Sequence, residues 1–157
     1  MTVTDSHIDP SVIIYKRELV NIYGAKIDAN TTIGPFVEIQ NDSVIGKNCK
    51  ISSHSFICNG VTIEDDVFIG HGVMFTNDLY PRSTDNNGKK LKFGDWDLLK
   101  TLVKKRVSIG SNATILCGIE IGENSIIGAG STVTKNIDKN TIYAGNPAKF
   151  VRKIKVD

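Results

Sequence analysis

The sequence has little cysteine and little excess charge, and each scarcity excludes a class of protein. The three cysteines, Cys49, Cys58 and Cys117, form no CxxC pair, so we expect small core residues rather than a metal or redox site. The formal net charge is only +2 and the pI is near 8.4. Such a mild balance predicts no binding to nucleic acid.

Long apolar runs are absent as well. No stretch approaches the roughly 18 apolar residues of a membrane-spanning helix, and the first residues lack a signal-peptide pattern. The sequence therefore predicts no membrane partner and a cytoplasmic location. A length of 157 residues predicts a single domain over 1–157.

What the sequence does contain is a strict period of six. Large apolar residues stand at Ile27, Ile33, Ile39, Ile45, Ile51, Ile57, Ile63, Ile69 and Phe75. Neither a helix of about 3.6 residues per turn nor a strand of period two produces this spacing. A chain that turns a corner every six residues does, and its stacked coils bury a continuous core. The period predicts an all-β fold, a parallel β-solenoid.

A second set of residues supports the solenoid and locates an interruption. Four places after each large residue stands a small or β-branched one, such as Thr31 or Ser43, which fits inside a narrow corner. The period resumes in another phase at Val103, Ile109, Ile115, Ile121, Ile127 and Val133. A loop is therefore expected to protrude over about 79–102, and loops of this length are often functional. A short C-terminal segment, about 139–157, follows the repeats.

Several stretches carry a family resemblance: Ile45-Gly46-Lys47-Asn48-Cys49-Lys50, Ile121-Gly122-Glu123-Asn124-Ser125-Ile126, Ile127-Gly128-Ala129-Gly130-Ser131-Thr132-Val133-Thr134 and Ala144-Gly145-Asn146-Pro147-Ala148. With them the chain resembles the hexapeptide-repeat acyltransferases from about residue 21 to 153. The resemblance implies a left-handed parallel β-helix and a homotrimer. It also implies acetyl-CoA as co-substrate, bound in a groove between subunits. The residues themselves predict no metal, because no CxxC spacing occurs and no three histidines converge.

A narrower resemblance lies in two stretches, 60–70 and 75–82. They look like the branch that N-acetylates nucleotide-linked (dTDP or UDP) 3-amino sugars for bacterial surface polysaccharides, such as the O-antigen of lipopolysaccharide. The implied activity is an N-acetyltransferase that moves acetyl from acetyl-CoA to the sugar amine. The implied partners are coenzyme A and a nucleotide-linked amino sugar.

Asn77, Asp78 and His71 are the candidate catalytic residues. Residues 18 apart stack on successive coils, so Asn41, Asn59 and Asn77 are expected to form a ladder whose amides satisfy one another. Asn77 also stands where the loop departs, and the resemblance implies that it meets the substrate amine. Asp78 or His71 could then carry the proton away.

Four further residues are candidates for substrate binding. His54 is 17 residues from His71 and is expected near the same corner. In the loop, Arg82 could meet a diphosphate with its planar fork, while Tyr80 and Trp96 could stack on a sugar or base. The alternative is that these side chains belong to an exposed polar flap.

Seven residues are candidates for binding coenzyme A. Gly118, Ala129, Gly130 and Ala144 offer little side chain to obstruct a pantetheine arm, although corner geometry demands small residues too. Lys149, Arg152 and Lys153 belong to a basic cluster that suits phosphates.

Three other functions stay open. A zinc enzyme on this fold would require three converging histidines, and His7 lies outside the repeat, so only His54 and His71 are near each other. A non-catalytic scaffold would need neither the loop nor the Asn77–Asp78 pair. O-acetylation of a sugar hydroxyl requires a true base, which Asn77 is not.

Overall fold

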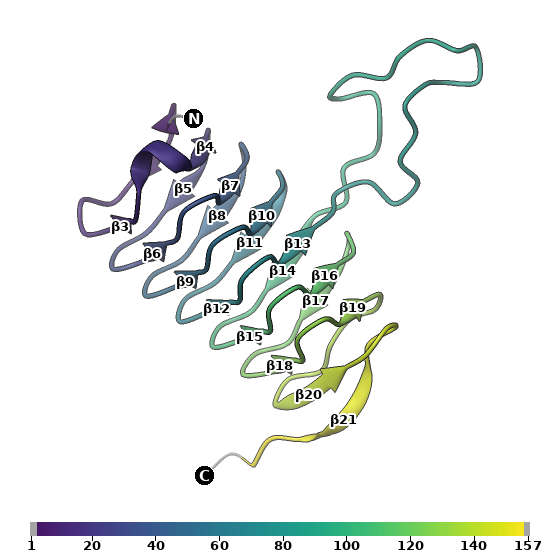
Figure 1. The fold of residues 1–157 in the computed structure, drawn as a ribbon. Helices are drawn as coiled ribbons and strands as arrows, with labels where there is room; N and C mark the ends of the chain where they lie inside the picture. The colour runs from purple at the N-terminus through teal and green to yellow at the C-terminus, as the bar shows by residue number, and fades with distance from the viewer. Residues whose placement is uncertain (1–2, 156–157) are drawn as a thin grey trace.

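The computed structural model, which describes residues 3–155, is a three-sided prism of stacked coils (Figure 1). The chain ascends the prism from one end to the other, and its two ends lie at opposite ends of the stack. All coil strands pair in parallel, and the left-handed β-helix expected from the sequence is confirmed. Within 3–155 the helical structure is one 3-10 turn, η1 (Arg17–Leu19), and no helix is long and apolar enough to cross a bilayer.

The strands form three sheets, one for each side of the prism. The first sheet contains β1 (Val3–Thr4), β4 (Asn21–Tyr23), β7 (Glu38–Ile39), β10 (Phe56–Ile57), β13 (Met74–Phe75), β16 (Thr114–Ile115) and β19 (Thr132–Val133). The second contains β2 (His7–Ile8), β5 (Lys26–Ile27), β8 (Val44–Ile45), β11 (Val61–Ile63), β14 (Thr101–Val103) and β17 (Glu120–Ile121). The third contains β3 (Ile13–Ile14), β6 (Thr32–Ile33), β9 (Lys50–Ile51), β12 (Phe68–Ile69), β15 (Ser108–Ile109), β18 (Ile126–Ile127), β20 (Thr141–Ala144) and β21 (Lys149–Lys153).

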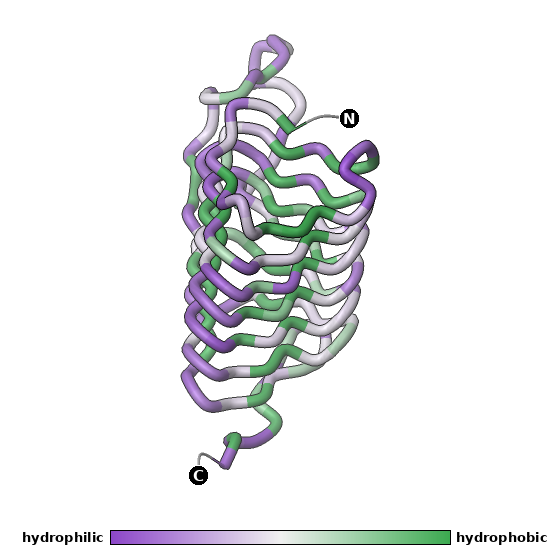
Figure 2. The backbone as a smooth tube through the Cα atoms, turned by 90° about the vertical axis from the view of Figure 1, so that its left-hand side faces the viewer, coloured by the Kyte–Doolittle hydropathy of each residue, from purple (hydrophilic) through white to green (hydrophobic). Residues whose placement is uncertain are grey.

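The period of six becomes a continuous core. Up to β19, strands three places apart in the chain pair with each other, so that Ile45 lies beside Ile63 and Ile33 beside Ile51. Every large residue of the period, in both phases, is buried. Figure 2 shows the apolar positions aligned from coil to coil. The prediction of inward-pointing isoleucines is confirmed.

Three corners join the sheets, and we number them for the description of the site. The first corner lies between the first and second sheets (for example 58–61), the second between the second and third (64–67), and the third between the third and first (70–73). The buried hydroxyl of Ser43 donates to the carbonyl of Cys58 at 3.0 Å, and Thr31 donates to Gly46 at 2.8 Å. These bonds satisfy corner carbonyls that no strand can pair.

The corner backbone explains where asparagine, aspartate and glycine recur. The third residue of a regular corner adopts a left-handed conformation, with φ of 58° at Asp42, 60° at Asp66 and 58° at Asn112. Asn and Asp tolerate this region better than most residues because their short polar side chains bond locally. His54 occupies it too, with φ of 63°.

The protruding loop spans residues 76–100, slightly earlier than the expected 79–102. Thr101 and Leu102 already belong to β14, because Thr101 pairs with Val61 and Val103 with Ile63. Most other neighbouring coils repeat after 18 residues, as Ile45 and Ile63 do. The step from Ile63 to Val103 is 22 residues longer, which is the size of the insertion.

The C-terminal segment closes the stack with a reversal of direction. β20 continues the third sheet in parallel beside β18, and β21 then pairs with β20 in antiparallel. The ring of Phe150 on β21 meets Tyr143 edge-on, with centroids 5.8 Å apart.

The three cysteines are buried and unpaired, as expected for small core residues. Burial raises the pKa of the Cys49 thiol to about 11 and that of Cys58 to about 12. Because the thiolate is the reactive form, a Cys117→Ser variant should show no rapid reaction with Ellman's reagent near pH 8 when folded, and two reactive thiols in guanidinium. Rapid labelling of the folded variant would contradict the buried placement.

Candidate functional site

At Asn77, on the first corner, the chain leaves the regular coil and enters the loop. Backbone hydrogen bonds hold the two ends of the loop to this corner. The N–H of Leu99 donates to the carbonyl of Asn77, and that of Thr101 to the carbonyl of Gly60, each at 3.2 Å. The hydroxyls of Thr76 and Thr101, at the two ends of the loop, are buried and have no hydrogen-bond partner within residues 3–155. The two backbone hydrogen bonds at the base of the loop hold Asn77 in place.

Beyond its base the loop projects away from the prism (Figure 1). Asp85 shapes its tip by accepting the backbone N–H groups of Asn87 and Lys89, both at 2.9 Å. Phe93 is exposed, and its ring meets Trp96 edge-on at 5.8 Å. The tip is therefore organised by local contacts within the loop.

A cavity of about 310 Å³ lies at the loop base, lined by Asp78, Leu79, Tyr80, Asp97 and Leu99. The Asp78 carboxylate accepts the backbone N–H of Tyr80 at 2.9 Å, and Tyr80 is 77% exposed. Two of the predicted site residues, Asp78 and Tyr80, thus meet beside Asn77. Arg82 and Trp96 are not in this lining; Arg82 is exposed and donates to the Pro81 carbonyl at 3.3 Å.

His71 and His54 lie on the third corner, on neighbouring coils, as their spacing indicated. Nδ1 of His71 is 2.8 Å from the hydroxyl of Ser53, and the backbone N–H of His71 donates to the hydroxyl of Ser111 at 3.2 Å. The His54 ring stacks on Phe36, with centroids 4.8 Å apart. His71 also lines a cavity of about 210 Å³ with Tyr15 and Lys50.

The three proposed catalytic residues are not gathered in one chain. Asn77 and Asp78 are on the first corner and His71 is on the third, at the opposite end of β13. Asn77 is six residues after His71, and the extended backbone that joins them can span up to ~20 Å. Within one chain, then, a proton could pass from a group bound at Asn77 to Asp78 but not directly to His71.

The predicted ladder of three asparagines contains two linked members. The side-chain N–H of Asn77 donates to the Asn59 carbonyl oxygen, whereas the Asn41 amide turns aside and donates to Asp42 at 3.0 Å. Asp42 lies exposed beside Asn41 and offers a charged acceptor, which is a stronger partner than a neutral amide.

Three residues predicted to bind coenzyme A, Ala129, Gly130 and Ala144, lie close together on the third corner near the C-terminal end of the stack. Ala129 and Gly130 are exposed, and a Cβ added to Gly130 would have nothing within 4 Å. Ala144 lies against Gly128, and the following Gly145 donates its N–H to Ser131 at 3.0 Å. This corner offers a bare stretch of backbone that a slender chain could follow.

Lys149, Arg152 and Lys153 lie on β21, all exposed, just after this bare corner. Two other basic residues near the C-terminus, Lys139 and Lys155, lie elsewhere. They line a cavity of about 620 Å³ together with Arg106, Glu123, Asn124, Asn140 and Ile154. Gly118 lies apart from the other six residues predicted to bind coenzyme A. It lies on the first corner, where Leu99 of the loop packs 3.6 Å from the position of an added Cβ.

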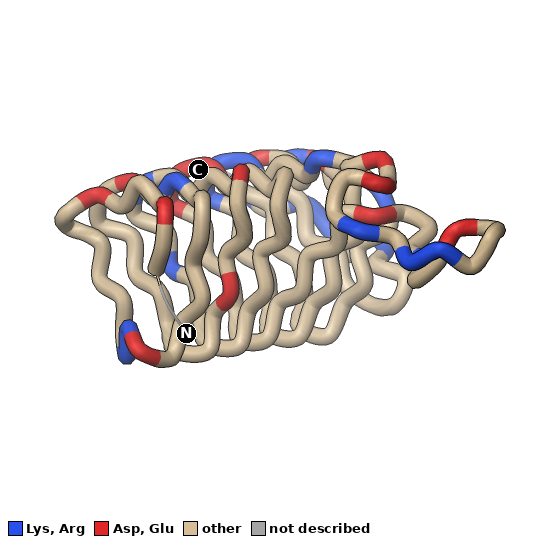
Figure 3. The backbone as a smooth tube through the Cα atoms, turned by 90° about the horizontal axis from the view of Figure 1, so that it is seen from above, with Lys and Arg blue, Asp and Glu red and all other residues tan. Residues whose placement is uncertain are grey.

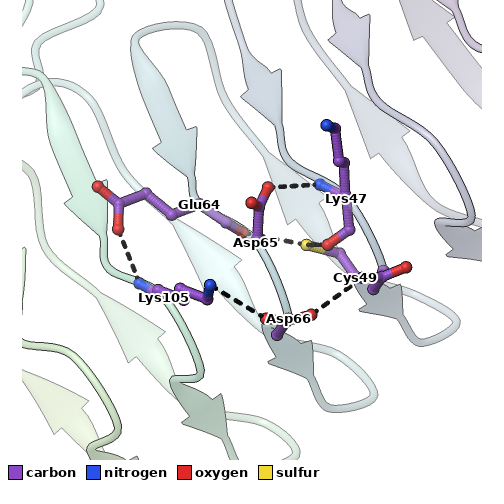
Figure 4. Close-up of polar contacts among 7 residues, drawn as sticks. Lys47, Cys49, Glu64, Asp65, Asp66 and Lys105 are labelled. Atoms are coloured by element: carbon purple, nitrogen blue, oxygen red, sulfur yellow. Dashed lines mark hydrogen bonds and ion pairs between the residues drawn. The ribbon is translucent and has the colours of Figure 1, made fainter.

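Charged residues are frequent along one edge of the prism and on the loop (Figure 3). On the second corner, Asp65 accepts the backbone N–H of Lys47, and Glu64 that of Lys105, both at 2.8 Å (Figure 4). Asp66 accepts from Asn48 at 3.1 Å and lies 3.7 Å from the Lys105 ammonium. These carboxylates are engaged in joining neighbouring coils, and within residues 3–155 no three metal-ligating side chains cluster.

The prism of six-residue turns defines a class of protein, the left-handed β-helices. This chain belongs to the bacterial transferase hexapeptide family, whose sequence model, "Bacterial transferase hexapeptide (six repeats)", matches residues 24–59, 42–77 and 100–135. A protein of Lysinibacillus sphaericus named "Probable macrolide acetyltransferase" is 47% identical over 53 residues, which are 34% of this chain and 29% of the relative. The chain thus matches less than a third of that relative's length.

Two solved structures share the fold. A point mutant of AntD, an N-acyltransferase from Bacillus cereus in complex with dTDP and coenzyme A, has a TM-score of 0.70 and 23% identity, with 98% of this chain and 83% of that chain covered. A hexapeptide-repeat acetyltransferase from Vibrio cholerae, complexed with acetyl coenzyme A, has a TM-score of 0.70 and 24% identity, with 89% and 74% covered.

Proposed function

We propose that the protein is an acetyl-CoA-dependent N-acetyltransferase acting on the amine of a nucleotide-linked 3-amino sugar, with dTDP or UDP as nucleotide, for a bacterial surface polysaccharide. The acetyltransferase name of the sequence relative and the coenzyme A and dTDP held by the Bacillus cereus structure support this proposal. The observation that carries it is the amide of Asn77, fixed beside a cavity at the point where the coil opens.

The acceptor would bind at the loop base. Asn77 would accept an N–H of the amine while the amine nitrogen bonds to the acetyl carbon and the carbon–sulfur bond of the thioester breaks. Asp78, which lines the cavity beside it, would take the proton that the nitrogen loses and pass it to the departing coenzyme A thiolate. Tyr80 exposes a ring on which a sugar or base can stack, and Arg82 supplies a planar donor pair for a diphosphate. Asn77 itself orients the amine, because an amide is no base near neutral pH.

The donor would lie along the third corner. Acetyl-CoA, when bound, supplies an activated thioester carbonyl. Ala129 and Gly130 fit its slender pantetheine arm because they leave the corner bare, and the basic side chains of β21 suit its phosphates. A backbone N–H of a corner would stabilise the negative charge that develops on the carbonyl oxygen.

We further propose that the complete site forms between subunits of a homotrimer. Asn77 and the bare backbone of Ala129 and Gly130 lie on different corners of one chain, so donor and acceptor would meet where the third corner of one subunit faces the first corner of the next. Light scattering should then give three times the 17.2 kDa of the chain.

Acetylation of a sugar hydroxyl is the second candidate, and His71 is the observation that favours it. In the tautomer whose Nδ1–H donates to Ser53, the Nε2 atom of His71 is free to act as a base, which a hydroxyl acceptor requires more than an amine does. The two functions differ in product, because an ester is cleaved by hydroxylamine and an amide is not.

One experiment with two arms tests the proposal. In the first arm, saturating acetyl-CoA should stabilise the folded protein by about 2.7 kcal/mol at a hundredfold excess over Kd, and a Lys149→Ala, Arg152→Ala, Lys153→Ala variant should lose most of the rise in Tm. In the second arm, mass spectrometry should find a hydroxylamine-resistant acetyl group on a dTDP- or UDP-linked 3-amino sugar. No rise in Tm overturns the donor, and a hydroxylamine-labile product overturns the amine.

A further inference from the structure

Asn59 is the buried partner of the proposed amine-binding residue. It lies on the first corner, one coil before Asn77, and is 3% exposed. Its side-chain carbonyl accepts the side-chain N–H of Asn77. A buried carbonyl is costly to leave without a donor, so this bond fixes which way the Asn77 amide faces.

The direction of that amide matters for the chemistry. A carboxamide presents donors on one side and an acceptor on the other. Since Nδ2 of Asn77 is turned to Asn59, Oδ1 lies on the opposite side and can accept an N–H of an incoming amine. The lone pair of the amine then stays free to attack. A reversed amide would donate a hydrogen bond to that lone pair and block it.

We propose that Asn59 is a positioning residue that holds Asn77 with its carbonyl toward the acceptor and thereby leaves the lone pair of a neutral amine free to attack. This inference rests on the proposed function, because it assumes that Asn77 meets the amine. In this proposal Asn59 touches neither substrate, and it acts only by orienting the Asn77 amide.

Asn59 is itself anchored by polar contacts across the outward face of the first sheet. Its backbone N–H donates to Oε1 of Gln40 at 3.4 Å, and Nε2 of Gln40 donates to Glu38 at 3.1 Å. The Tyr23 hydroxyl also donates to Glu38 at 3.4 Å. An ionised carboxylate only accepts, so Glu38 turns the Gln40 amide and leaves its carbonyl for Asn59. Burial, and next the charge of Glu38, raise the pKa of Tyr23, which keeps it a donor.

The test is a double-mutant cycle with an amine-bearing nucleotide sugar that the wild-type protein acetylates. Asn59→Ala should lower kcat about tenfold with little change in KM for acetyl-CoA, because Asn77 can then reverse. Asn59→Asp keeps a carbonyl-type acceptor and should restore most of the rate. Asn41→Ala is the matched control, since Asn41 has the same place on the corner but bonds Asp42.

The decisive arm uses Asn77→Asp, whose two carboxylate oxygens both accept. In that background orientation no longer matters, and adding Asn59→Ala should change kcat less than twofold, roughly. An equal tenfold loss in both backgrounds would show a merely structural role and overturn the inference, as would an Asn59→Ala enzyme with the wild-type rate. Melting temperatures of all variants identify any that fail to fold. If the wild-type protein acetylates no amine, the proposed function falls first and this inference with it.

Discussion

Replacing Asn77 by alanine is expected to lower kcat/KM for the amino-sugar nucleotide by about a hundredfold, which is about 2.7 kcal/mol of transition-state stabilisation. The substitution would remove the side-chain carbonyl that is proposed to accept an N–H of the amine. Steady-state kinetics with acetyl-CoA saturating would measure the loss. The rise in Tm on adding acetyl-CoA should be unchanged, because Asn77 is proposed to contact the acceptor amine and not coenzyme A.

Asn77→Asp is the conservative comparison for this prediction. It keeps an acceptor toward the amine, and Asn59 can turn its own amide to donate to the new carboxylate, so kcat/KM should stay within about tenfold of the wild-type value. An Asn77→Ala enzyme with undiminished kcat/KM would show that the amine binds elsewhere.

Phe75→Ala is expected to give the largest loss of stability. Phe75 is the one aromatic residue in the column of isoleucines, is 1% exposed, and packs inside the coil from which the loop departs. Truncation would leave a cavity and cost about 3–5 kcal/mol of unfolding free energy. For a chain of this size, Tm should fall by about 2–4 °C for each kcal/mol. Calorimetry at one fixed protein concentration would measure it, since an oligomer's Tm depends on concentration.

Phe68→Ala removes the same atoms from the outward side of a neighbouring strand. Phe68 is 38% exposed and contacts the Lys50 ammonium at 5.9 Å from its ring centroid. Its loss should cost less than about 1.5 kcal/mol, because no internal cavity forms. Equal losses for the two phenylalanines would contradict the inward placement of Phe75.

The coil was predictable from sequence because each six-residue unit repeats one local solution. A buried isoleucine, a turn residue and a small corner residue recur, and errors in one unit do not propagate to the next. The loop bounds were less predictable. Thr101 reads as loop by its polarity, yet it fills the inner corner place beside Val61 and belongs to β14.

The candidate site was predictable in its residue types but not in their grouping. The same period that revealed the fold also implies that His71 and Asn77, six residues apart, occupy different corners, and that signal was available in the sequence. The role of Asn59 was not, because a ladder at 18-residue spacing does not say which amide bonds which. Asn41 has the same spacing and turns to Asp42 instead.

The antiparallel strand β21 has a consequence for how the molecule behaves in a crowded cell. A stack of parallel coils ends in an open row of backbone groups, which is a template on which another molecule could continue the stack into a fibre. β21 covers β20 and runs in the opposite sense, and it carries Lys149, Arg152 and Lys153 along its exposed length. Reversed polarity and repelling positive charge therefore oppose head-to-tail growth at the edge of the third sheet.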